Sequence, residues 1–314
     1  MSPPPRTLPS GLVRIAVHFN PLSGKGRAAA LARDVAGAAS AAGHTVVLLP
    51  TRSGHPLTKA EIEGIDVLAV AGGDGTIHWT LDALCDAPTA VYHVPSGTEN
   101  LFAREFGTTA RPGQFVEWVD ANRVVRVDLG SCNAVLFSLM CSFGPDAGII
   151  HRLGNARKGP ITTASYLKPV LSELIDPRIP RLSIWSQGRP VVIRERGMLI
   201  VGNSRHYAWG LNPARTAEID DGLLDFAFFP ADTVADVLVW AVRLGATWDR
   251  CQTRHRALPT GVIHFQSSAA RIQSHQADCL CQMDGEQKVI PSSGDLFDFR
   301  VLEGSLRVLG PSNR

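Results

Sequence analysis

The sequence predicts an α/β fold, with a doubly wound, Rossmann-like N-terminal domain followed by an antiparallel β-sandwich domain with a few helices. Two observations support this prediction. Up to about residue 128, β-rich runs alternate with helical stretches, which is typical of a parallel sheet. Beyond it, short strands separated by Gly and Asp-Gly turns dominate. The 314 residues also favour two domains, because single hydrophobic cores usually stop growing near ~250–300 residues.

Four strands and the helices between them define the first domain. The β-rich runs lie at residues 12–19, 45–49, 65–71 and 90–94. The third run is almost continuously apolar, as expected of a strand that is covered on both faces. An Ala-rich helix follows the first strand and extends to about Ala42, where Gly43 can end it. A second helix is predicted over residues 77–84.

The second domain is predicted to contain three helices and several short strands. The helices lie at residues 145–154, 165–175 and 232–244, and the strands at 181–186, 190–196, 198–201, 223–229, 262–266 and 279–290. We therefore expect residues 12–127, joined by about 297–310, to form an α/β domain. Residues 128–296 would form a β-rich domain, and the proline-rich residues 1–11 a disordered tail.

Composition excludes several classes of protein. With 31 basic and 29 acidic residues, the net charge of +2 is unsuited to non-specific nucleic-acid binding. The 45% hydrophobic content is too high for a disordered chain. No run reaches the ~18 apolar residues of a membrane span, so we expect no transmembrane segment. Six scattered cysteines and the absence of a signal peptide favour a cytoplasmic protein.

The sharpest local motif is a glycine-rich segment between the third strand and the next helix. It reads Gly72-Gly73-Asp74-Gly75-Thr76. Glycines allow the backbone to approach a ligand closely, and a helix N-terminus offers unpaired N–H groups to a phosphate. Phosphate would repel Asp74 unless a divalent cation lies between them, so this residue indicates Mg²⁺ or proton abstraction. The alternative is a tight turn in which Asp74 caps the helix.

Two further loops leave the same predicted edge of the sheet, at residues 20–26 and 95–100. Ligands of open parallel sheets bind outside the carboxyl ends of the strands, so the three loops should line one crevice. Neither the P-loop spacing nor the dinucleotide fingerprint is present. Each loop alone is compatible with ordinary turn chemistry, but together they favour a nucleotide site.

The ordered set of motifs resembles the diacylglycerol kinase catalytic-domain family, which includes bacterial lipid kinases, sphingosine kinases and ceramide kinases. The three loops resemble its nucleotide loops, residues 127–130 its domain-crossover segment, and residues 158–166 its glycine–tyrosine helix. Residues 220–225 and 284–286 resemble its two later acidic motifs. The resemblance extends from about residue 13 to residue 308.

The resemblance implies ATP as co-substrate and Mg²⁺ as the metal. It implies that residues 12–127, with about 297–310, form the ATP-binding domain and that residues 128–296 form the lipid-substrate domain. The implied ATP-binding residues are Asn20, Pro21, Ser23, Gly24, Thr51, Gly72, Gly73, Asp74, Gly75, Thr76 and Thr98. The implied metal residues are Asp74 and Asp128, with a second, structural cation at Glu218, Asp221 and Leu223. Glu286 matches the general base that takes the proton from the lipid hydroxyl, and Asp74 is its rival for that role.

The residues alone leave the later motifs open. Asp284-Gly285 is first of all a hairpin turn, and Asp220-Asp221-Gly222 is equally a turn or a cation loop. The chain also departs from the family: His78-Trp79 stands where many members have Asn-Glu, and Leu101 stands where many have Asp. These departures concern the identity of the acceptor more than nucleotide binding.

The resulting hypothesis is an ATP-dependent lipid kinase. It would transfer the γ-phosphoryl group to a hydroxyl of a membrane lipid such as diacylglycerol or a sphingoid or ceramide-like lipid. The enzyme would be cytoplasmic and associate peripherally with the membrane during turnover, and it could form a homodimer. The alternatives are an NAD kinase-like enzyme, whose nucleoside-binding motifs we do not find after Asp128, and a non-catalytic nucleotide- or lipid-binding relative.

Overall fold

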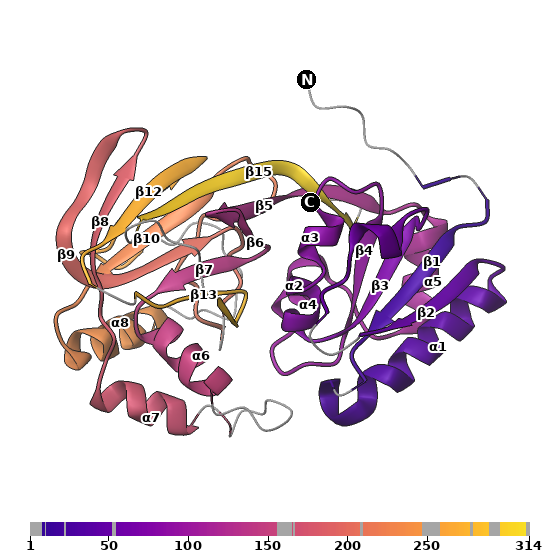
Figure 1. Cartoon of the computed structure of the whole chain (residues 1–314), viewed down its shortest axis with the longest axis horizontal. Coiled ribbons are helices and arrows are strands. Elements are labelled where there is room, and N and C mark those ends of the chain that lie inside the picture. Colours follow the sequence, from indigo (N-terminus) through magenta and orange to yellow (C-terminus); the bar gives the residue numbers. More distant parts are fainter. Residues whose placement is uncertain are drawn as a thin grey trace. The chain divides into compact units, whose positions relative to one another are not determined.

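The computed structural model describes residues 8–9, 11–21, 23–51, 55–155, 165, 167–207, 210–246, 258–276, 279–288 and 296–311. The chain divides into two compact units (Figure 1). Unit 1 comprises residues 1–127 and 304–314, and unit 2 comprises residues 128–303. The predicted class, an α/β region followed by a β-rich region, is confirmed.

Unit 1 is built on a parallel sheet with the order β2-β1-β3-β4. These strands are β1 (Arg14–Phe19), β2 (Thr45–Pro50), β3 (Val67–Gly72) and β4 (Ala90–Pro95). The end of β15 (Leu296–Leu309) extends the sheet, because it pairs in parallel with β4. Every residue of β3 is buried, which explains its continuous apolar sequence.

Helices cover both faces of this sheet (Figure 1). On one face, α1 (Arg27–Ala41) and α5 (Pro112–Asp120) pack on alternate residues of the strands, among them Ile15, Val17 and Ala69. On the other face lie α2 (Asp74–His78), α3 (Leu81–Leu84) and α4 (Leu101–Phe106). Short 3₁₀ turns, Ser23–Gly26 and Lys59–Ile62, follow β1 and precede β3.

The helix predicted over residues 77–84 is broken into α2 and α3. The Thr80 hydroxyl donates to the carbonyl of Ile77 at 2.7 Å, and the Thr80 N–H also bonds to that carbonyl. A side chain that bonds back to the preceding turn competes with continued α-helix. The tail prediction also differs at one residue: Leu8 is buried, and its N–H donates to Asn122 Oδ1 at 2.8 Å. Residues 1–7 and 10 of that predicted tail lie outside the described residues.

The described part of unit 2 consists of antiparallel strands with helices beside them (Figure 1). One ladder runs β14-β13-β7-β9-β8-β12-β15, and β10 pairs with both β9 and β11. The strands are β5 (Val124–Cys132), β6 (Val135–Phe137), β7 (Met140–Phe143), β8 (Arg181–Ser186), β9 (Arg189–Gly202), β10 (Leu224–Pro230), β11 (Ile263–Ser267), β12 (Ala269–Ser274), β13 (Cys281–Met283) and β14 (Glu286–Lys288). The helices are α6 (Pro145–Asn155), α7 (Leu167–Ile175) and α8 (Val234–Ala246).

Two strands predicted at residues 190–196 and 198–201 form the single strand β9. Gly197 lies inside this strand. A Cβ at this position would lie 2.4 Å from the carbonyl oxygen of Phe229 on the paired strand β10, so the position requires glycine. Glycine in this strand therefore marks a close backbone approach and not a turn. Of the predicted motif at residues 158–166, only Ser165 is among the described residues. In the described part of the chain, no helix has the length and apolar character needed to cross a membrane.

Candidate nucleotide site and catalytic turn

The strand register of unit 1 brings the predicted loops to one edge of the sheet. Phe19 at the end of β1 pairs with Pro50 at the end of β2 and with Ala71 of β3. Gly72 at the end of β3 pairs in turn with Pro95 at the end of β4. All four strands therefore end at the same level. The segments that follow them, which contain Asn20, Thr51, Asp74 and Thr98, emerge at the carboxyl edge of the sheet.

The loops approach one another so closely that side chains are excluded between them. A Cβ at Gly97 would lie 2.7 Å from the Cα of Gly73. A Cβ at Gly24 would lie 2.6 Å from the carbonyl oxygen of Ser96, and Gly24 also has a φ of +58°. Real Cβ contacts are not this short, so only glycine fits at these two positions. The three loops thus converge as predicted, and they meet through backbone atoms.

A buried histidine supports the glycine loop, residues 72–76. His93 lies on β4, is fully buried, and its Nε2 is 3.0 Å from the carbonyl oxygen of Gly72. Burial lowers the pKa of His93, and the charge of Asp74 opposes this effect only in part. The ring is therefore neutral near pH 7, and because a carbonyl only accepts, Nε2 carries the proton. Sequence reasoning missed His93, since nothing in a buried strand distinguishes it from a core residue.

Asp74 connects two elements instead of capping its own helix. It is half-buried, and its Oδ1 accepts a hydrogen bond from the backbone N–H of Phe102 in α4 at 3.0 Å. No side chain caps α2, so the alternative role of Asp74 as a cap is excluded. Among the described residues, Asp74 Oδ2 has no hydrogen-bond partner. With five residues, α2 is also too short to supply the helix-terminus field that we predicted for phosphate.

The other predicted nucleotide residues lie around this loop. Ser23 Oγ is 3.4 Å from Ser96 Oγ, and the half-buried Thr51 donates its N–H to the carbonyl of Phe19 at 2.8 Å. Pro21 and Thr98 are exposed. The structure therefore brings together the loop residues predicted for ATP, with Pro21 and Thr98 on the solvent side.

Asn100 shapes the loop of residues 95–100. Many members of the family that the sequence resembles also have Asn at this position. It has a left-handed φ of 50°, its Oδ1 accepts from the N–H of Gly97 at 2.8 Å, and its Nδ2 donates to the carbonyl of Gly97 at 2.9 Å. The departures from the pattern occupy different surroundings: Leu101 and His78 are buried, whereas Trp79 is 47% exposed.

The predicted hairpin in unit 2 is present, and Asp284 anchors it. Met283 pairs with Glu286 across the turn. The buried Asp284 carboxylate accepts four hydrogen bonds from one segment, at 2.8–3.1 Å: from the backbone N–H groups of Ser138, Leu139 and Met140, and from the Ser138 hydroxyl. Glu286 follows two residues later and is half-buried at the start of β14. The sequence marked Asp284 only as a turn residue, because its four donors come from a distant segment.

The second acidic motif is a braced turn that gathers negative charge. The buried Asp128 carboxylate accepts the N–H of Gly222 at 2.7 Å, and Asp221 accepts the N–H of Leu223 at 2.9 Å. Burial, followed by the charges of Asp225, Asp128 and Glu218, raises the pKa of Asp221 to about 6. Carboxylates that repel one another in this way are suited to a divalent cation. Across the described ranges, however, no three His, Cys, Asp or Glu side chains are gathered as metal ligands.

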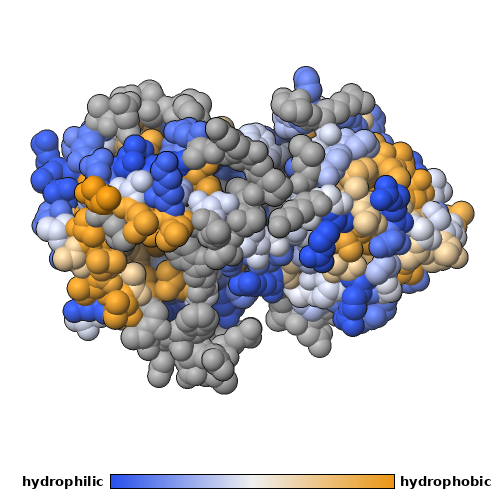
Figure 2. All heavy atoms as spheres, turned by 90° about the horizontal axis from the view of Figure 1, so that it is seen from below, coloured by the Kyte–Doolittle hydropathy of each residue, from blue (hydrophilic) through white to orange (hydrophobic). Residues whose placement is uncertain are grey.

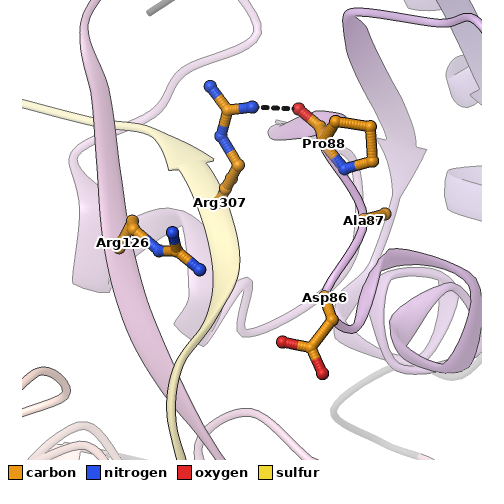
Figure 3. A pocket seen from close by; sticks show the side chains of 5 residues that line it. All are labelled: Asp86, Ala87, Pro88, Arg126 and Arg307. Carbon is orange, nitrogen blue, oxygen red and sulfur yellow. Dashed lines mark hydrogen bonds between the residues drawn. The ribbon is translucent and has the colours of Figure 1, made fainter. Parts of the chain in front are cut away.

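A cavity of about 220 Å³ lies elsewhere in unit 1 (Figure 3). It is lined by Asp86, Ala87, Pro88, Arg126 and Arg307, and is therefore next to the start of β4, at the opposite edge from the glycine loop. Arg307 donates to the carbonyl of Pro88, and Arg126 donates to the carbonyl of Gly304 at 2.8 Å. Both arginines hold backbone segments together, and this cavity contains none of the predicted site residues.

Comparison with known proteins identifies the relatives of the chain. Residues 14–132 match the family described as the diacylglycerol kinase catalytic domain. A diacylglycerol kinase of Mycobacterium tuberculosis is 28% identical over 72% of this chain and 76% of its own length. A protein of Pseudomonas fluorescens named a probable lipid kinase YegS-like is 29% identical over 78% of each chain.

Solved structures show the same fold. The crystal structure of a diacylglycerol kinase from Bacillus anthracis superposes with a TM-score of 0.67 at 15% identity and covers 96% of this chain and 98% of its own. Yeast NADH kinase complexed with NADH matches less well, with a TM-score of 0.50 at 12% identity over 98% of this chain and 87% of that one. At such identities the likeness concerns the fold alone.

The named relatives support the expected class of enzyme, a phosphotransferase that acts on a lipid alcohol. The resemblance to the diacylglycerol kinase catalytic-domain family, first indicated by the motifs, is confirmed.

Proposed function

We propose that the protein is an ATP-dependent lipid kinase that transfers the γ-phosphoryl group to a hydroxyl of a membrane lipid, such as diacylglycerol or a sphingoid or ceramide-like lipid. The observation that carries this proposal is the close approach of three loops at one sheet edge, where Gly73 and Gly97 leave no room for side chains. Such a surface offers backbone N–H groups to phosphate oxygens. The names of the relatives support a lipid as the acceptor.

Unit 1 would bind ATP, and unit 2 would supply the lipid-substrate region. The residues proposed for ATP are Asn20, Pro21, Ser23, Gly24, Thr51, Gly72, Gly73, Asp74, Gly75, Thr76 and Thr98. Their side chains are small or polar, and the net charge of the chain is only +2. Both features suit recognition of phosphate through backbone amides.

Mg²⁺ is proposed at Asp74, and Asp128 is also proposed as a metal residue. In support, Asp74 keeps Oδ2 without a hydrogen-bond partner among the described residues while Phe102 holds Oδ1. Mg²⁺ would supply positive charge to the phosphates during transfer. A structural cation is proposed at Glu218, Asp221 and the carbonyl of Leu223, supported by the raised pKa of Asp221.

Glu286 is the proposed general base, with Asp74 as the alternative. The turn before Glu286 is fixed by the four hydrogen bonds to Asp284, and a fixed carboxylate is what proton abstraction from a hydroxyl needs. Asp74 is already committed through Oδ1 to Phe102, which favours a role in holding the nucleotide. In the proposed step, the lipid oxygen forms the new P–O bond, its proton goes to Glu286, and ADP leaves.

Peripheral contact with the membrane is also proposed, for a cytoplasmic enzyme. Helix α7 exposes Leu167 (64%), Leu171 (52%) and Ile175 (85%) at helical spacing, and α8 exposes Val242 (68%). Apolar side chains of this kind gather at the surface in Figure 2. An enzyme whose acceptor has alkyl chains in a bilayer needs such a surface near it.

One assay tests the proposed function. The purified protein is incubated with labelled ATP, Mg²⁺ and mixed bacterial lipids, or with NAD in place of lipid. We expect label in a lipid phosphate and formation of ADP. Label in the NAD arm would instead support the NAD kinase-like alternative. Binding of ATP with no ADP formed in either arm would support a non-catalytic relative, and would overturn the proposal.

A further inference from the structure

A chain of buried and half-buried polar side chains in unit 2 ends at the turn between β13 and β14. Tyr207 OH and Ser142 Oγ both donate to Asp146 Oδ2. Gln282 Nε2 then donates to Ser142 Oγ at 2.7 Å. At the end of the chain, the N–H of Gly285 donates to Gln282 Oε1 at 2.8 Å. Ser142 and Gln282 face each other on the paired strands β7 and β13, which lie beside α6 in Figure 1.

The two central side chains, Ser142 and Gln282, are shielded from water. Ser142 is fully buried, and Gln282 is 3% exposed. Burial, reinforced by the charge of Asp146, raises the pKa of Tyr207 well above its ordinary value, so the tyrosine keeps its proton and donates it. In such surroundings a polar group without a partner is destabilising, so the hydrogen bonds of Ser142 and Gln282 stabilise this part of the fold.

The direction of every hydrogen bond in the chain follows from its two ends. The backbone N–H of Gly285 can only donate, so the atom of Gln282 that faces it must be the oxygen. The amide nitrogen of Gln282 therefore points at Ser142 and donates to it. Ser142 accepts this bond, so its own proton goes to the carboxylate of Asp146. The Gly285 N–H at one end and the Asp146 carboxylate at the other thus require the same orientation of the Gln282 amide.

We propose that Gln282 is a positioning residue for the catalytic turn. Its amide oxygen holds Gly285, while Asp284 is held from the other side by residues 138–140. With both central residues of the turn fixed, the direction in which Glu286 leaves the turn is fixed too. Asp146, Ser142 and Tyr207 act by keeping the amide of Gln282 in the required orientation. This inference rests on the proposed function, in which Glu286 is the general base.

Two substitutions at this position separate positioning from packing. Gln282→Met keeps the volume and removes both hydrogen bonds. We expect kcat for lipid phosphorylation to fall roughly 10–100-fold, because small misplacements of a reacting group cost this much, while KM for ATP stays within about two-fold. Gln282→Glu keeps an acceptor for Gly285, and when protonated it also regains the donor to Ser142.

The ratio of kcat for Gln282→Glu to that of the parent protein should therefore rise as pH falls. The titratable groups around this amide are Asp146 and Tyr207 in the chain itself and Glu286 on the same hairpin; His151 on α6 bonds to the carbonyl of the neighbouring Cys281, and Cys141 lies next to Ser142 on β7. They are present in both proteins, so the ratio cancels their own titration. A ratio that does not change with pH, or a kcat for Gln282→Met within two-fold of the parent, would overturn the inference.

Amide exchange at Gly285 and the variant Glu286→Gln separate this inference from the proposed function. The Gly285 N–H should be protected in the parent protein, exposed in Gln282→Met, and protected again in Gln282→Glu at low pH. Unchanged protection in Gln282→Met overturns the positioning role even where activity is lost. If Glu286→Gln keeps full activity, the assignment of the base fails, and the exchange data still decide whether Gln282 holds the turn. If Gln282→Met does not fold, Gln282→Glu and Ser142→Ala decide the same question.

Discussion

The glycine loop of unit 1 and the proposed catalytic turn of unit 2, residues 283–286, are held in different ways. Where the glycine loop meets the loop of residues 95–100, the two backbones touch: a Cβ at Gly97 would lie 2.7 Å from Gly73 Cα. At the catalytic turn, the backbone is held by side chains: the Asp284 carboxylate accepts four hydrogen bonds, and Gln282 holds Gly285. The first contact leaves no room for a side chain between the two backbones, whereas the second depends on side-chain hydrogen bonds.

The difference follows from what each region is proposed to do. A phosphate group is recognised by several backbone N–H groups at once, which requires a bare backbone. A general base is a single carboxylate whose position matters to a fraction of an ångström, which requires a rigid frame. Substitutions should therefore act on nucleotide affinity in unit 1 and on the rate of transfer or on folding in unit 2.

The largest effect is expected from Asp74→Asn. The amide oxygen can still accept from Phe102, so the local geometry is kept while the charge is removed. We expect kcat/KM for lipid phosphorylation to fall roughly 10³-fold, in the range of losses seen when a catalytic charge is removed. The thermal midpoint should change little. Full activity in this variant would contradict the proposed site.

Glu173→Gln is expected to weaken unit 2 by about 3 kcal/mol, because it breaks a buried ion pair. Glu173 is 2% exposed and accepts from Arg152 Nε at 2.8 Å, which joins α7 to α6 behind the catalytic turn. The exposed pair of Arg271 and Asp298 is the control: Asp298→Asn should cost at most about 1 kcal/mol. Urea unfolding measures both variants. Equal costs would show that the buried pair has no special role.

Gly97→Ala tests the bare backbone of unit 1. The added methyl group meets Gly73 Cα at 2.7 Å and Asn100 Oδ1 at 3.0 Å. We expect a loss of about 1–3 kcal/mol in stability and a KM for ATP raised at least roughly ten-fold. The matched control is Gly37→Ala in the middle of α1, where no atom lies within 4 Å of the new Cβ. It should gain about 1 kcal/mol and leave KM unchanged. An unchanged KM in Gly97→Ala would argue against phosphate binding at this contact.

The smallest effect concerns the acidic turn. The pKa of Asp221 is raised to about 6 from an ordinary value of 3.8, so the folded state holds this proton more tightly than the unfolded chain. In EDTA, the stability gained from this group is present below about pH 4 and is lost as the pH rises towards 6. Asp221→Asn should flatten that slope and raise the thermal midpoint modestly at pH 7–8, since the carboxylate is largely exposed to solvent. An identical slope in the variant would remove Asp221 as its cause.

Local sequence predicted the parts of the fold whose causes are local. The apolar run that became β3, the Ala-rich α1 and the turn at Asp284-Gly285 were all predicted from neighbouring residues. The predicted helix at residues 77–84 was wrong, because the Thr80 side chain bonds to the carbonyl of Ile77. Gly197 was read as a break between strands, although the backbone of β10 is the reason that glycine is needed there.

The fold class, the glycine loops and both acidic turns could be located without the structure, because glycines, turn residues and periodic apolar runs act through their own neighbours. Three contacts became visible only in the folded chain: Asp74 bonds to Phe102, His93 supports Gly72, and Ser142 orients the amide of Gln282. These contacts join residues 21 to 140 positions apart. Hydrogen bonds across such separations depend on strand register and burial, which no local pattern specifies.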